Sequence, residues 1–277
     1  MEKIFVAYGD ATFKESLSRI KKQAKAIGRF DKILIYTPEN LPAFVKASPL
    51  FAFSRGGGYW VWKPYIVIDA LSKCQVGDVI CYADAGCTLN PNSEEWEFYY
   101  AQLDKYNAIF FQYRDNVSYP GWEKFCSNPK NNSSKILYWM KPATIDYFQD
   151  YFGDDRFLNF SKIWGGCFFI KKTYNLINVI TEWYNLALFH PILFIDPIGK
   201  ENINLPETFN QHRHDQSVIT PLIFFFKEKD NILLLPETAE SDPKNAAIIA
   251  SRYKSAKKVS LYTRIKCLVY KIIHSVL

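Results

Sequence analysis

The chain has 277 residues, of which 48% are hydrophobic and 17% aromatic, enough for one large α/β domain or one domain with a small appendage. The formal net charge is +6, yet no acidic residue follows Asp242, whereas eight lysines and arginines do. The body is therefore close to neutral, which argues against nucleic-acid binding by the whole protein. The basic tail is more typical of a segment that meets a membrane surface.

Cysteine usage and the start of the chain bear on the cellular compartment. Six cysteines occur without a CxxC motif, and most, such as Cys81 and Cys167, stand in apolar surroundings. This pattern favours buried thiols in a reducing compartment. Met1 leads directly towards a predicted strand without a signal peptide, and no apolar run reaches the ~18 residues of a membrane span. We therefore expect a cytoplasmic protein.

The chain opens with a β-α-β pattern. Residues 4–8 are an apolar, strand-forming run, residues 13–27 repeat apolar side chains at helical spacing, and residues 32–36 form a second apolar run. A crossover of this length predicts two parallel strands. The loop over residues 8–12 has no GxGxxG, and the chain has no P-loop lysine motif, so the usual dinucleotide and nucleoside-triphosphate sites are not indicated.

A glycine-rich stretch follows. Three successive glycines at 56–58 either let the backbone approach a ligand closely or simply form a flexible loop. Aromatic and cationic side chains surround them, and these are Arg55, Tyr59, Trp60, Trp62 and Lys63. A helix is predicted to run from Pro64 to about Leu71. The patch is suited to binding a diphosphate, or alternatively it packs the start of this helix on the sheet.

The central strand is predicted at residues 79–82 and ends at Asp84, followed by Ala85 and Gly86. An apolar run of this kind is typical of a buried strand in a parallel sheet. Ligands of open α/β sheets bind at the carboxyl ends of the strands. Asp84 is therefore a candidate for metal or phosphate chemistry, and the alternative is a turn or helix-capping aspartate.

The second half predicts further alternation of helices and strands. We expect helices within residues 89–105, at 145–152 and at 174–189, and a strand at 108–111. Residues 163–170 are interpreted as a loop that enters a strand, in which Gly165 and Gly166 would let a substrate lie against the backbone. Residues 210–217 form a dense polar cluster before an apolar stretch, which indicates a site or, alternatively, a helix cap at Asp215.

The order of these stretches resembles the bacterial sugar transferases of capsule, O-antigen and related polysaccharide gene clusters. The stretches that carry the resemblance are, in order, Tyr8-Gly-Asp10, Arg55-Gly-Gly-Gly-Tyr-Trp-Val-Trp-Lys-Pro-Tyr65, Tyr82-Ala-Asp-Ala-Gly86, Trp164-Gly-Gly-Cys167 and His212-Arg-His-Asp-Gln-Ser217. The similarity covers roughly residues 3–235. It implies an α/β protein of the GT-A type, a Rossmann-like fold with a mixed, mainly parallel sheet flanked by helices. We expect this domain over residues 1–242 and a basic C-terminal helical segment over 243–277.

The resemblance also implies a donor site for a nucleotide-diphosphate sugar. The residues it places there are Tyr8, Asp10, Arg55, Tyr59, Trp60, Lys63, Asp84, Gly86, Gly165, Gly166 and Gln216. In GT-A enzymes a DxD motif holds a metal with the diphosphate. Asp84 would be the first acid, but Gly86 stands where the second would be. Mn²⁺ or Mg²⁺ would then be held by Asp84 with a late histidine, for which His212 and His214 are the candidates, or Asp84 would instead bind the ribose or the sugar. Asp215 would be the catalytic base or contact the donor sugar.

The implied reaction moves a hexose, taken as galactose-like, from a UDP-linked donor to a lipid-linked or oligosaccharide acceptor during surface polysaccharide synthesis. Two alternatives remain. A nucleotidyltransferase of related fold would normally show a glycine-rich loop with Arg and Lys after the first strand, which residues 8–12 lack. A non-catalytic glycan-binding subunit is consistent with the loss of the second acid at Gly86.

The tail over residues 251–277 predicts a basic amphipathic helix. Leu261, Ile265, Leu268 and Ile272 share one helical face, bordered by basic residues. Such a helix lies in the interface of an anionic membrane. Each basic residue near the surface contributes ~1 kcal/mol to the binding free energy. We therefore expect peripheral association with the inner face of the cell membrane. The alternative is a helix that packs on the body or on a second subunit.

Overall fold

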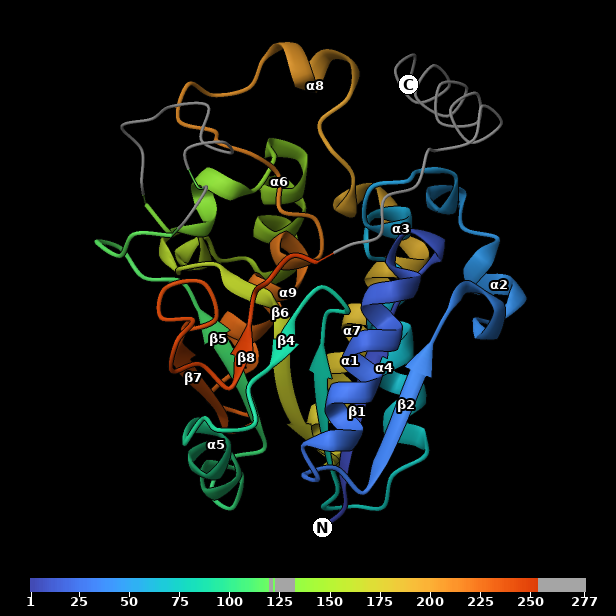
Figure 1. The fold of residues 1–277 in the computed structure, drawn as a ribbon. Helices are drawn as coiled ribbons and strands as arrows, with labels where there is room; N and C mark the ends of the chain where they lie inside the picture. The colour runs from blue at the N-terminus through green and yellow to red at the C-terminus, as the bar shows by residue number, and fades with distance from the viewer. Residues whose placement is uncertain (120–121, 123–132, 254–277) are drawn as a thin grey trace.

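A six-stranded mixed sheet forms the centre of the computed structural model, which describes residues 1–119, 122 and 133–253 (Figure 1). The strand order is β2-β1-β3-β6-β5-β7, and only β6 runs antiparallel to its neighbours. The strands of this sheet are β1 (Lys3–Tyr8), β2 (Lys32–Tyr36), β3 (Val79–Ala83), β5 (Ala108–Gln112), β6 (Ile163–Lys171) and β7 (Ile232–Pro236). The predicted α/β class with a mainly parallel sheet is confirmed.

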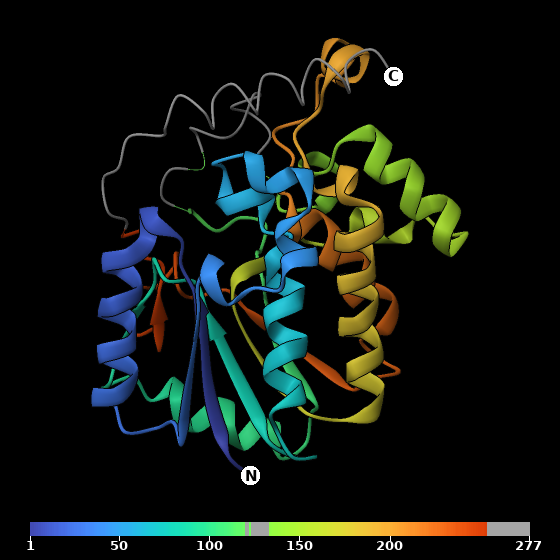
Figure 2. The same ribbon diagram turned by 90° about the vertical axis from the view of Figure 1, so that its right-hand side faces the viewer.

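Helices cover both faces of the sheet, as the turned view shows (Figure 2). The α-helices are α1 (Lys14–Ala26), α2 (Ala43–Lys46), α3 (Gly56–Tyr59), α4 (Trp62–Ser72), α5 (Glu95–Leu103), α6 (Pro142–Phe152), α7 (Tyr174–Phe189), α8 (Gly199–Ile203) and α9 (Asp215–Phe226). Phe168 and Phe169 of β6 mark the two faces, since Phe168 contacts Trp183 of α7 and Phe169 contacts Tyr99 of α5. Helix α1 lies on one side of the sheet, and α4 and α7 pack together on the other.

Local sequence explains most of these elements. Leu17, Ile20 and Ala24 of α1 are buried at helical spacing, and its lysines are exposed. All five residues of β3 are buried, as the continuous apolar run predicted. Asp10 closes the turn after β1, because its Oδ1 accepts a hydrogen bond from the Thr12 N–H at 2.8 Å. The carboxyl ends of β1 and β3 lie side by side because the two strands pair in parallel.

Strand β6 corrects one expectation. Gly165 and Gly166 lie inside the strand rather than in a loop before it. A Cβ at Gly166 would stand 2.4 Å from Cζ2 of Trp164, so a glycine is required where the indole folds over its own strand. The strand is also antiparallel, paired with β3 on one side and β5 on the other. Periodicity along the sequence carries no information on that direction.

The chain beyond Asp242 returns to the body. A second, two-stranded sheet joins β4 (Thr88–Leu89) to β8 (Ile248–Ile249), close to the end of β3. Residues 243–253 therefore pack against the domain predicted for residues 1–242, and the predicted helical segment from residue 254 onward lies outside the described residues. Within the described part of the chain, no helix has the length and apolar character needed to cross a membrane.

Candidate active site at the carboxyl end of the sheet

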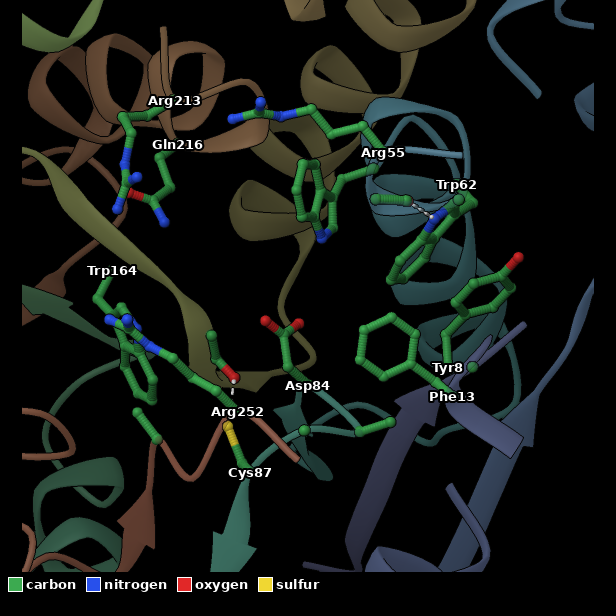
Figure 3. Close-up of a pocket in the computed structure, with 18 of the residues that line it drawn as sticks. Tyr8, Phe13, Arg55, Trp62, Asp84, Cys87, Trp164, Arg213, Gln216 and Arg252 are labelled. Atoms are coloured by element: carbon green, nitrogen blue, oxygen red, sulfur yellow. Dashed lines mark hydrogen bonds between the residues drawn. The ribbon is translucent and has the colours of Figure 1, made fainter. Parts of the chain in front are cut away.

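A cavity of about 590 Å³ opens at the carboxyl ends of β1 and β3 (Figure 3). Of the residues predicted to bind the donor, those that line it are Tyr8, Asp10, Arg55, Trp60, Asp84, Gly86, Gly166 and Gln216. Its size is within the range of pockets that hold a small organic ligand. These predicted residues therefore share one cavity, and its walls differ in chemical character.

An aromatic wall stands at the β1 side. The rings of Tyr8 and Trp62 are stacked with centroids 3.8 Å apart and an interplanar angle of 23°. The Trp62 indole N–H donates to the Gly56 carbonyl at 2.8 Å, which fixes the ring plane. Asp10 lines the cavity beside this pair. Flat apolar rings next to a carboxylate are suited to a heterocyclic base and its polar edge.

Asp84 lies at the centre of the cavity, directly after β3 (Figure 3). Its backbone N–H donates to the Gly166 carbonyl at 2.9 Å, and its Oδ1 accepts from the Tyr82 hydroxyl at 2.5 Å. The side chain is 37% exposed. One edge of this carboxylate is thus held from below, while the group remains accessible from the cavity.

Lys63 lies beneath Asp84 and does not line the cavity. Its side chain is 1% exposed, and its Nζ donates to Asp215 Oδ2 at 2.5 Å and to the Gly165 carbonyl at 2.9 Å. Asp84 Oδ1 is 3.5 Å from the same Nζ. Burial lowers the pKa of Lys63, but the two carboxylates outweigh burial and raise it above its ordinary value. Lys63 therefore stays charged and supports Asp84 from behind.

Asp215, the predicted catalytic residue, is the other half of this buried pair. It begins α9, its side chain is 6% exposed, and it is not among the residues that line the cavity. Gly165, near the start of β6, lies directly against it, since a Cβ at Gly165 would come 2.9 Å from Asp215 Oδ2. Tyr59 is likewise buried and donates its hydroxyl to Asp196 at 3.2 Å.

The two histidines predicted as metal ligands are buried in the wall behind the cavity. His212 Nδ1 accepts from the Lys141 N–H at 3.2 Å, and its Nε2 lies 2.8 Å from the Leu193 carbonyl. His214 Nδ1 lies 2.8 Å from the Phe194 carbonyl, and its ring stacks on Trp60. Burial lowers the pKa of both imidazoles well below the ordinary value, so they are neutral. They fix the loop before α9.

Three arginines line the same cavity as Asp84, and two of them were missing from the predicted site. Arg55 is 3.8 Å from Asp196, Arg213 donates to Gln211 at 3.0 Å, and Arg252 donates to Glu240 at 2.9 Å. All three line the cavity, and in Figure 3 Arg55 extends across its upper part towards the side where Arg213 and Gln216 lie. Arg213 stood within the recognised His-Arg-His-Asp motif, whereas Arg252 had been assigned to the tail.

The residues present do not fit a protein-bound divalent cation. Within the described ranges, no three His, Cys, Asp or Glu side chains come close enough to share a metal ion. His212 uses both ring nitrogens on the backbone, and Gly86 supplies no carboxylate. Asp84 is left as the only member of the predicted ligand set that reaches the cavity.

Comparison with known proteins gives distant structural likenesses only. No family model and no curated protein matches the sequence. A glycosyltransferase involved in the glycosylation of the major capsid of PBCV-1 aligns over 96% of this chain and 100% of its own, at 9% identity and a TM-score of 0.48. Mouse xyloside xylosyltransferase 1 in its apo form aligns over 85% of both chains, at 9% identity and a TM-score of 0.40. Likenesses of this size leave the function to be argued from the chain's own residues.

Proposed function

We propose that the protein is a glycosyltransferase that transfers a hexose from a nucleotide-diphosphate sugar, with a UDP-linked donor. The observation that carries the proposal is the cavity at the carboxyl ends of β1 and β3, where an aromatic wall, a central carboxylate and three arginines face the same space. An aromatic pocket suits the base, cations suit the diphosphate, and a carboxylate suits sugar or ribose hydroxyls.

Sugar transfer requires both the carboxylate and the arginines of this cavity. Cleavage of the anomeric C–O bond leaves negative charge on the departing diphosphate and positive charge on the sugar ring. Arg55 and Arg213 stabilise the leaving group, because fixed cations in a partly enclosed site act more strongly than in water. Asp84 accepts hydrogen bonds from donor hydroxyls and stabilises the developing positive charge on the sugar. Asp215 acts on Asp84 through Lys63, as a positioning residue.

The proposals for the acceptor and for the cellular location rest on the sequence alone. We propose a lipid-linked or oligosaccharide acceptor of surface polysaccharide synthesis, reached at the inner face of the cell membrane through the basic segment over residues 251–277. An amphipathic basic helix and a membrane-held acceptor are consistent with each other, since both place the reaction at an anionic surface.

Release of UDP from UDP-hexoses is the experiment that tests the proposal. The wild-type protein is incubated with UDP-galactose and other UDP-hexoses, with and without oligosaccharide acceptors, and UDP is quantified. We expect release in the wild type and at least ~100-fold slower release in Asp84→Asn, because the charge at the centre of the cavity is lost. Circular dichroism checks that the variant is folded.

Each alternative function gives a different result. A nucleotidyltransferase releases pyrophosphate from a nucleoside triphosphate and a sugar phosphate, and no UDP from UDP-hexoses. A glycan-binding subunit binds glycans without any UDP release. Asp84→Asn with wild-type activity would remove Asp84 from the reaction.

A further inference from the structure

We propose that Arg252 supplies the positive charge at the donor diphosphate that a metal ion would otherwise provide, so that donor binding requires no divalent cation. The inference rests on the proposed function. It comes from the contact between residues 250–253, here called the strap, and the glycine that stands where the second acid of the metal motif would be.

The strap lies directly against Gly86. A Cβ at Gly86 would stand 3.3 Å from the Tyr253 carbonyl oxygen and 3.6 Å from Arg252 Cα, and the Tyr253 N–H donates to the Gly86 carbonyl at 3.1 Å. A side chain at position 86 would therefore press against the strap, which would have to shift by a few tenths of an ångström. The strap occupies the space beside Gly86 into which the second acid of the metal motif would extend.

The strap is anchored on several sides. The Ala250 N–H donates to the Ala239 carbonyl at 3.1 Å, and Ser16 Oγ donates to the Tyr253 carbonyl at 2.9 Å. The guanidinium of Arg19 lies 4.9 Å from the centre of the Tyr253 ring. Arg252 itself has φ of +52°, a left-handed conformation that costs a non-glycine residue about 1 kcal/mol or more. The surrounding contacts hold the residue in this conformation, which is typical of functional positions.

The Arg252 side chain lines the cavity, and in Figure 3 it extends from beside Cys87 towards Trp164. Glu240 holds it by one guanidinium nitrogen at 2.9 Å, and Glu240 in turn accepts from the Tyr113 hydroxyl at 3.3 Å. The Arg252 side chain remains 49% exposed, while that of Glu240 is 7% exposed. A guanidinium has five N–H donors in a planar fork, so the bond to Glu240 leaves donors for phosphate oxygens.

The rest of the predicted metal set supports the same inference. His212 and His214 bond to the backbone instead of facing Asp84, and Gly86 contributes only its backbone to the cavity wall. Arg252 joins Arg55 and Arg213, so the cations around Asp84 come from three separate parts of the chain. A diphosphate held by three guanidinium groups does not need a metal to balance its charge.

Calorimetric titration of UDP into the full-length protein, first in EDTA and then with MnCl₂, tests the inference. We expect wild-type dissociation constants that agree within about twofold in the two conditions. In EDTA, Arg252→Gln should weaken UDP binding about tenfold or more, as expected for the loss of a charge-assisted contact, while Arg252→Lys keeps part of the affinity. Arg156→Gln is the matched control, because Arg156 is exposed, pairs with Asp154 and does not line the cavity.

Two results would overturn the inference while the proposed function stands. One is UDP binding by the wild type that appears only with Mn²⁺, and the other is unchanged affinity in a folded Arg252→Gln protein. Absence of UDP binding in both conditions, together with no UDP release from UDP-hexoses, would overturn the proposed function and this inference with it. The wild-type comparison in EDTA and Mn²⁺ remains decisive even if a variant fails to fold.

Discussion

Two groups of charges lie on opposite sides of Asp84, and they differ in burial. Below it, the side chains of Lys63 and Asp215 are 1% and 6% exposed and form a tight pair. Around the cavity, those of Arg55 and Arg252 are 41% and 49% exposed and have acidic partners at 3.8 and 2.9 Å. Removal of one partner from a buried ion pair strongly destabilises the folded state. Exposed ion pairs contribute only about 0–1 kcal/mol to stability and can exchange partners. The lower pair therefore fixes geometry, and the arginines are available to bind an anion.

The largest effect should follow from breaking the buried pair. Lys63→Met leaves the Asp215 carboxylate without its cation, and we expect a loss of about 3–5 kcal/mol in the free energy of unfolding, measured with urea. The double variant Lys63→Met/Asp215→Asn removes both charges and should recover most of that loss. Equal stability of the single and double variants would contradict the assignment of a coupled pair.

The arginines should behave in the opposite way. Arg213→Gln removes a cation from the cavity wall, and we expect about tenfold weaker UDP binding with a change in unfolding free energy below ~1 kcal/mol. Titration calorimetry and thermal unfolding of the same sample measure both. Arg213→Lys is the control that keeps the charge. A Gln variant that loses stability but not affinity would assign Arg213 to packing against Trp139, 5.3 Å from its guanidinium.

Glu237 shows what a buried carboxylate does without so close a cation. It is fully buried, and burial raises its pKa to about 7 from an ordinary value of 4.5. Because the folded state then binds the Glu237 proton more tightly than the unfolded state does, the contribution of Glu237 to folding stability is greatest below pH 4.5. This contribution falls as the pH rises towards 7. Glu237→Gln should remove this loss, about 3 kcal/mol, seen as a higher melting temperature than the wild type at pH 8 but not at pH 4.5. The same difference at both pH values would refute the titration.

The smallest effect on the site is expected from the tail. Deletion of residues 254–277 keeps Arg252, so UDP affinity should change less than about twofold. Anionic liposomes should co-float the full-length protein and not the truncated one, because the predicted basic amphipathic segment is gone. Equal flotation of both proteins would exclude this segment as the anchor.

The sequence was most informative where structure depends on nearby residues. Helix α7 and strand β2 have the predicted bounds, because apolar spacing and the closing residues are local signals. Asp84 was found for the same reason, since a buried run that stops at an acid marks the end of a central strand. The four described cysteines are buried and free, as their apolar neighbours predicted.

Long-range contacts account for what the sequence did not reveal. Lys63 and Asp215 are charged residues of the kind that bind ligands, and only the fold shows that both are buried and do not line the cavity. Their pairing joins α4 to α9, which no periodic pattern links. Arg252 was assigned to the tail by charge alone, and only the pairing of β8 with β4 brings it to the site.

The central claim, that the arginines around Asp84 bind the diphosphate of a nucleotide sugar, is tested most directly by titrating the wild-type protein with UDP and with UMP. We predict that UDP binds at least about tenfold more tightly than UMP, a difference of ~1.4 kcal/mol. Equal affinities, or no binding of either nucleotide, would contradict the claim.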